Sequence, residues 1–71
     1  MDKPLELVKL GRRIKEVRIS KGLSQAKLGI NIMKDQQSIH KVEAGEFNPT
    51  YMYLLDIAKG LEMPLPELLN F

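Results

Sequence analysis

The chain has 71 residues and no cysteine, so we expect one domain without disulfide bonds, cysteine metal sites or a thiol nucleophile. No apolar run approaches the ~18 residues of a membrane-spanning helix, and the first residues lack the apolar stretch of a secretory signal, so we expect a soluble, cytoplasmic protein. Residues 1–22 carry seven Lys or Arg against three Asp or Glu, whereas residues 46–71 carry one against four. This distribution of charge suits a protein that binds a polyanion with one face. The alternative is chance clustering of charge on a solvated surface.

The spacing of apolar residues predicts five short helices and no strand, and hence an all-α, compact five-helix fold in a single domain over residues 1–71. The first helix is predicted over about residues 5–20. Its apolar stripe consists of Leu10, Ile14 and Val17, which recur at helical spacing.

Two shorter helices follow, over about residues 25–32 and 36–44, with Ser24 and Asp35 as their N-caps. Together they predict a helix-turn-helix over about residues 24–45. The side chains that this pair is expected to bury are Leu28, Ile32, Ile39 and Val42.

Thr50 is the expected N-cap of a fourth helix over about residues 51–61. Its buried side is expected to consist of Leu54, Leu55, Ala58 and Leu61, with Ile57 at the edge. A last short helix over residues 65–70 lies in an apolar segment of about residues 64–70, which we interpret as a dimerisation segment around a two-fold axis; the alternative is that its apolar groups are all internal. The residues assigned to this dimer interface are Met63, Leu65, Leu68, Leu69 and Phe71.

The third predicted helix has a polar outward side that bears Gln37, His40 and Lys41, with Gln36 on its flank. A glutamine amide presents a donor and an acceptor together, which match adenine N6 and N7 in the major groove of DNA. Two adjacent glutamines at the start of a helix that follows a short turn therefore indicate the tip of a recognition helix, against the alternative of two ordinary surface glutamines. We expect His40 to be solvated, although a DNA contact or pH sensitivity is the alternative.

Glu43 falls on the inward side of the third helix, together with Ile39. A lone buried carboxylate is costly, so it needs a partner. Arg18 lies one turn after Ile14 on the core side of the first helix, and we predict that Arg18 and Glu43 form a structural ion pair.

From residue 10 to residue 69 the chain resembles the Cro/CI-type (XRE family) helix-turn-helix proteins. The residues that carry the resemblance are Gly11-Arg12-Arg13-Ile14, Arg18, Lys21-Gly22-Leu23-Ser24-Gln25, Leu28, Ile39, Val42, Glu43, Gly45, Asn48-Pro49-Thr50, Leu54-Leu55-Asp56-Ile57-Ala58-Lys59, Leu61 and Glu67-Leu68-Leu69. Each is weak alone, but the ordered set at family spacing is specific. Residues 36–39 are similar to the recognition helix of lambdoid phage repressors. The resemblance implies a lambda-repressor-like fold and the same arginine–glutamate pair.

The resemblance also implies the roles of the polar residues. It assigns base contacts to Gln36, Gln37 and Lys41, the last at a base edge or a phosphate. Phosphate contacts are expected near helix starts, whose free N–H groups and dipole favour anions, with additions from neighbouring side chains. The residues assigned to phosphate are Ser24, Gln25, Lys34, Ser38, Asn48 and Thr50.

The sequence departs from the family at the turn between the two central helices. The family usually has glycine and then an apolar residue there, whereas this chain has Met33 and Lys34. Either Met33 adopts the backbone geometry that glycine eases, or the turn differs. Gly29 replaces the usual alanine, at a cost to the helix of ~1 kcal/mol.

We therefore expect a sequence-specific, double-stranded DNA-binding transcriptional regulator, a repressor or an activator, that acts as a homodimer on a palindromic operator. The alternative is an antitoxin-type protein-interaction module that also binds its own promoter. An enzyme is disfavoured, because the chain has one histidine, no cysteine, no glycine-rich phosphate loop and no cluster with metal-ligand spacing. No cofactor, metal, membrane or small-molecule substrate is expected.

Overall fold

A computed structural model describes residues 3–71, so the first two residues of the predicted domain lie outside the described part. The described chain contains five helices and no strand, which confirms the predicted all-α, five-helix class. The helices are α1 (Leu5–Ser20), α2 (Gln25–Asn31), α3 (Gln36–Glu43), α4 (Tyr51–Gly60) and α5 (Leu65–Leu68). The predicted bounds of α1 are confirmed, whereas α2, α3, α4 and α5 each end one or two residues earlier than predicted. None of the described helices is both long and apolar enough to cross a membrane.

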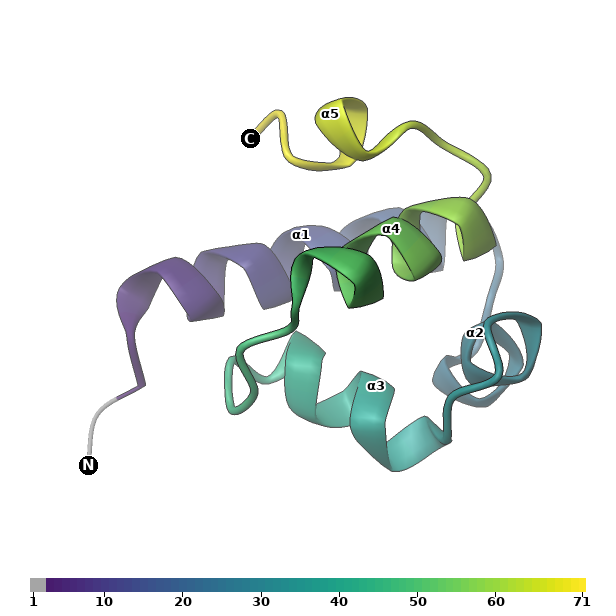
Figure 1. The fold of residues 1–71 in the computed structure, drawn as a ribbon, viewed down its shortest axis with the longest axis horizontal. Helices are drawn as coiled ribbons and strands as arrows, with labels where there is room; N and C mark the ends of the chain where they lie inside the picture. The colour runs from purple at the N-terminus through teal and green to yellow at the C-terminus, as the bar shows by residue number, and fades with distance from the viewer. Residues whose placement is uncertain (1–2) are drawn as a thin grey trace.

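Helix α1 is the longest element, and the other helices are arranged around it (Figure 1). In this view α4 lies in front of α1, α5 lies above them, and α2 and α3 lie below. Helix α1 contacts α3 and α5, and α2 contacts both α3 and α4. The pair α2–α3 is therefore held against the rest of the molecule from two sides, with one face of α3 directed outward.

The starts of the three central helices follow from their N-caps. The Ser24 side chain accepts a hydrogen bond from Lys27 N at 3.0 Å, and the Asp35 side chain accepts one from Ser38 N at 2.6 Å. Thr50 Oγ1 accepts a bond from the backbone N of residue 53 at 3.1 Å. Each cap satisfies a backbone N–H group that has no partner within its helix, and all three predicted caps are confirmed.

The turn between α2 and α3 closes by the hydrogen bonds of a Schellman motif. Lys34 N donates to Gly29 O at 2.8 Å, and Met33 N donates to Ile30 O at 3.3 Å. Met33 has φ 59°, in the left-handed region. This residue thus adopts the geometry for which the family usually has glycine, and the turn keeps that form without glycine.

Gly11 allows α1 and α3 to approach closely. A Cβ atom at this position would lie 2.5 Å from Val42 O and still closer to Glu43 O, both backbone atoms of α3. No side chain fits into that space without moving one of the helices. The glycine therefore sets how closely α3 lies against the helix behind it.

The hydrophobic core is formed by all five helices. Its fully buried side chains include Ile14, Leu28, Ile39, Ile57, Leu61 and Leu68. The predicted buried side of α4 is partly wrong: Ile57 is fully buried rather than at the edge, whereas Leu54 and Leu55 are only partly buried. The reason is that α4 is rotated so that Tyr53, Ile57 and Leu61, which are spaced four residues apart, face the core.

The C-terminal segment is fastened to α1 by an arginine. Arg13 Nε donates to Leu68 O at 2.9 Å, and Arg13 Nη2 donates to Glu67 O at 3.0 Å. Leu65 and Leu68 are buried within the chain's own core at 6% and 0% exposure. The predicted dimer interface is therefore corrected at these two positions, which offer no surface to a second chain.

Candidate nucleic-acid interface

Helix α3 separates its side chains between the core and the surface. Ile39, Val42 and Glu43 are buried on one side. Gln36, Gln37, His40 and Lys41 are all exposed on the other. The exposed groups are two amides, an imidazole and an ammonium, and all of them can hydrogen-bond base edges or phosphates.

Two hollows flank the outward side of α3. The first, of about 540 Å³, is lined by Gln25, Asp35, Gln36, Gln37 and His40. The second, of about 220 Å³, is lined by Asp35, Gln37, Ser38, Lys41 and Phe47. Gln37 and Asp35 each line both hollows, and both side chains are exposed.

Behind this surface, Arg18 and Glu43 form the ion pair that the helical spacing predicts. Arg18 Nε lies 2.6 Å from Glu43 Oε2, and Arg18 Nη2 donates to Glu43 Oε1 at 3.0 Å. The side chains of the pair are only 9% and 3% exposed. Arg18 Nη1 also donates to Leu23 O at 2.7 Å, so the same guanidinium holds α1, the chain entering α2 and α3 together.

Gln25 joins this network from the first turn of α2. Its Nε2 donates to Glu43 Oε1 at 3.0 Å, which fixes the amide at the rim of the first hollow. One amide hydrogen of Gln25 is thus already used. A phosphate contact at this residue would come from the second amide hydrogen or from the backbone N–H.

The other residues assigned to phosphate lie in three places. Ser24 precedes α2, and Asn48 and Thr50 lie exposed in the connection between α3 and α4. Ser38 Oγ shares a short hydrogen bond with the hydroxyl of Tyr53, so this serine is engaged within the chain. The Nζ atom of Lys34 lies 5.1 Å from the centre of the same tyrosine ring.

Sequence reasoning missed Tyr53 and Phe47 as parts of this surface. Tyr53 links α4 to Ser38 and carries the Lys34 ammonium over its ring, and Phe47 packs against it with ring centroids 5.8 Å apart. A tyrosine at the start of a helix and a phenylalanine in a loop carry no motif of their own, so only the tertiary structure could identify them.

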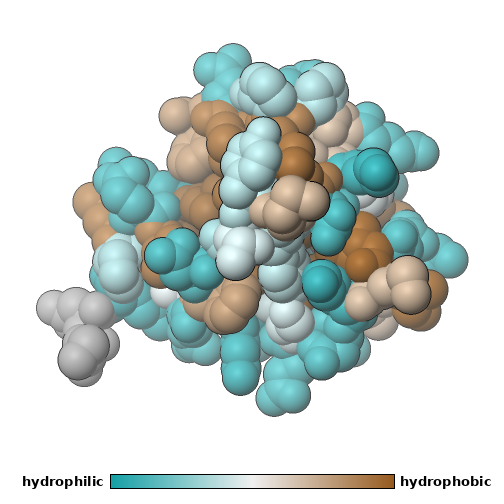
Figure 2. Space-filling model, viewed as in Figure 1, coloured by the Kyte–Doolittle hydropathy of each residue, from teal (hydrophilic) through white to brown (hydrophobic). Residues whose placement is uncertain are grey.

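On the face shown in Figure 2, hydrophilic residues line the lower edge of the molecule, where Figure 1 places α3. Hydrophobic residues gather in the upper middle of this face and at its right-hand edge.

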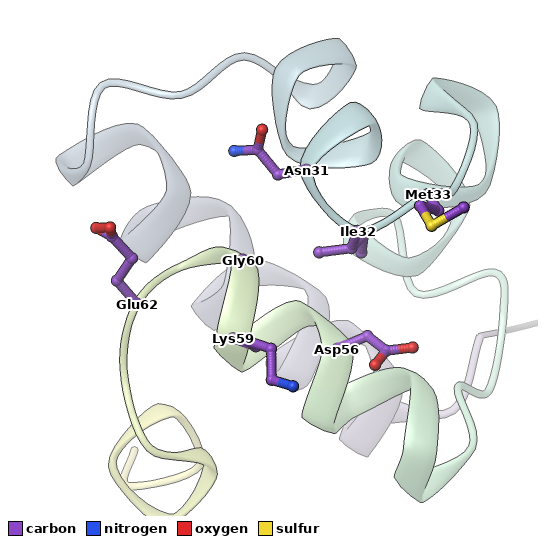
Figure 3. Close-up of a pocket in the computed structure, with 7 residues that line it drawn as sticks. All are labelled: Asn31, Ile32, Met33, Asp56, Lys59, Gly60 and Glu62. Carbon is purple, nitrogen blue, oxygen red and sulfur yellow. The ribbon is translucent and has the colours of Figure 1, made fainter.

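A further hollow of about 360 Å³ lies between the C-terminal ends of α2 and α4 (Figure 3). It is lined by Asn31, Ile32, Met33, Asp56, Lys59, Gly60 and Glu62. Two carboxylates and one ammonium make it a poor site for a polyanion, and it shares no residue with the hollows on α3.

Comparisons with known proteins agree with this geometry. A helix-turn-helix family model matches residues 14–68. In sequence, the chain is similar to the uncharacterized HTH-type transcriptional regulator YgzD of Bacillus subtilis (strain 168), with 31% identity over 55 residues that make up 78% of this chain and 83% of YgzD.

Solved structures with the same fold include two restriction-modification controller proteins. C.AhdI of Aeromonas hydrophila matches with a TM-score of 0.89 and 35% identity, over 92% of this chain and 98% of its own. A point mutant of C.Esp1396I matches with a TM-score of 0.88 and 30% identity, over 94% of this chain and 85% of its own. The clp gene regulator ClgR of C. glutamicum, at 18% identity and a TM-score of 0.87, shares the fold. The chain is therefore a member of the XRE-type helix-turn-helix family of DNA-binding transcriptional regulators.

Proposed function

We propose that the protein is a cytoplasmic repressor that binds a palindromic operator in double-stranded DNA as a homodimer, with α3 of each protomer in the major groove. The observation that carries the proposal is the exposed polar side of α3, where Gln36, Gln37, His40 and Lys41 lie together. A helix of this kind can enter the groove and pair its side chains with base edges.

In this proposal Gln36, Gln37 and Lys41 contact bases. Adenine is the preferred partner of both glutamines, because their amides match its N6 and N7. Phosphate contacts would fix the depth and angle of α3 without reading sequence. The residues proposed for them are Ser24, Gln25, Lys34, Asn48 and Thr50, with a smaller part for Ser38, which already bonds within the chain.

The homodimer is proposed around the C-terminal end of the chain. Leu69 and Phe71 are 41% and 61% exposed, and Met63 is partly exposed. These three residues remain from the predicted interface after Leu65 and Leu68 are assigned to the core. They give two copies a shared apolar patch that water would otherwise cover.

We further propose that the genes under its control include those of a restriction-modification system. Two similar structures, at 35% and 30% identity, are restriction-modification controller proteins, and the match to C.AhdI covers 98% of that chain. Binding of the protein to DNA upstream of restriction endonuclease and methyltransferase genes near its own gene, measured against a scrambled duplex of equal length, tests this part of the proposal.

Selection of duplex DNA from a random pool tests the central function. The protein should select a two-fold symmetric site, and Gln37→Ala should lose about 1–3 kcal/mol of binding free energy and relax the preference at one base pair in each half-site. Lys59→Ala, which removes an exposed cation from α4, is the matched control and should select the unchanged site. An unchanged site and affinity for Gln37→Ala would contradict the role of this glutamine.

A further inference from the structure

Building on the proposed function, we propose that His40 is an additional base-reading residue. It donates a hydrogen bond to N7 of a guanine within each half-site.

The first support is the position of His40 on α3. It is exposed, and it lies three residues after Gln37 and four after Gln36, so all three share one side of the helix. It also lines the first hollow together with both glutamines and Gln25. When α3 lies in the major groove, a base edge that faces the glutamines also lies beside the imidazole.

The second support is that the groups around His40 leave its ring available. A small hollow of about 100 Å³ joins it to Lys15 of α1, Gln25 of α2, and Glu43 and Ala44. Both oxygens of Glu43 are already bound by Arg18, and one of them also by Gln25.

The remaining charged neighbours of His40 are Asp35, Lys15 and Lys41. Oδ1 of Asp35 accepts the bond from Ser38 N, and Lys15 and Lys41 carry positive charge. Within the described residues neither carboxylate hydrogen-bonds the imidazole, so its N–H remains available to DNA.

The chemistry of the ring then selects the base. An imidazole N–H donates one hydrogen bond in a fixed direction. Guanine presents only acceptors along its major-groove edge, whereas adenine places the N6 donor beside its N7, so an N–H donor favours guanine.

The experiment uses the duplex that the wild-type protein selects, with 7-deazaguanine replacing one guanine at a time. At one guanine in each half-site the replacement should weaken wild-type binding about five-fold or more, and it should not weaken binding by His40→Ala. Thermal unfolding of His40→Ala checks that the fold is kept, and Lys59→Ala controls for the loss of a polar side chain elsewhere.

Each result bears on the proposal. If His40→Ala binds the same site with the same affinity and the same sensitivity to 7-deazaguanine as the wild type, while Gln37→Ala loses affinity, His40 is only solvated and the proposed function stands. If the wild-type protein selects no duplex at all, the proposed function fails and the role of His40 fails with it.

Discussion

At the residue scale, the pair of Arg18 and Glu43 connects the stability of the fold to the position of α3. Its two side chains are 9% and 3% exposed. Arg18 also donates to Leu23 O, and Glu43 also accepts a hydrogen bond from Gln25. Burying two charges is costly, so their net contribution depends on the complete set of partners. Removing one partner leaves the other charge buried without compensation.

We therefore expect Glu43→Gln to lower the free energy of unfolding by about 3 kcal/mol, because it removes the charge that balances Arg18 while it keeps the shape of the side chain. Urea unfolding followed by circular dichroism measures the loss. A double-mutant cycle with Arg18→Met is the control, and the two losses should be strongly non-additive. Losses that add to within about 0.5 kcal/mol would show that the two residues are not coupled.

The pair could be predicted from sequence because both of its residues lie at helical positions on the core side. Arg13 could not be assigned in the same way. It binds the carbonyl groups of Glu67 and Leu68, and those carbonyls reach it only through the packing of α5 on α1. The contact of Ser38 with Tyr53 has the same origin. Periodicity places Arg18 and Glu43 on the core sides of their helices, whereas the contacts of Arg13 and Ser38 depend on how distant helices pack.

At the scale of elements, the turn from α2 to α3 sets the direction of α3 relative to α2. Met33 has φ 59° and is 92% exposed, so its side chain adds almost no packing, while its backbone is in a region that glycine adopts more easily. The left-handed conformation costs a non-glycine residue about 1–2 kcal/mol.

Met33→Gly should therefore raise the free energy of unfolding by about 0.5–1 kcal/mol, after allowance for the greater entropy of glycine in the unfolded chain. Met33→Ala is the matched control, since it shortens the side chain but keeps the strained backbone, and it should stay within about 0.5 kcal/mol of the wild type. Thermal and urea unfolding measure both variants. A glycine variant no more stable than the alanine variant would show that the turn stores no strain at this residue.

The helix starts could be predicted because a capping side chain and the N–H group that it binds are three residues apart in the sequence. The rotation of α4 could not. Leu54, Leu55 and Ile57 are all apolar, so the pattern alone allows more than one buried side. Tyr53 decided between them, since its ring is buried while its hydroxyl reaches Ser38, and a tyrosine can be buried in this way when its polar end has a partner.

At the scale of the whole molecule, size and symmetry bear on how the protein would read DNA. The chain measures 32 × 25 × 22 Å, close to the ~34 Å that separates successive major grooves on one side of the duplex. In the proposed dimer, the outward side of α3 would contact DNA and the exposed C-terminal residues would contact a second copy of the chain.

Phe71→Glu tests this arrangement, because the side chain is 61% exposed and its replacement leaves the core intact. Each substitution occurs twice across a two-fold axis, so the lost burial should weaken dimerisation by about 3 kcal/mol or more, over 100-fold. Sedimentation equilibrium should then find monomers where the wild type is dimeric, and affinity for a duplex with two half-sites should fall toward that for one half-site. Ile30→Glu, which changes a 70% exposed apolar residue on α2, is the matched control for self-association. Two results would contradict this interface. One is a wild-type protein that stays monomeric while it binds both half-sites with full affinity. The other is a dimer that dissociates with Ile30→Glu and persists with Phe71→Glu.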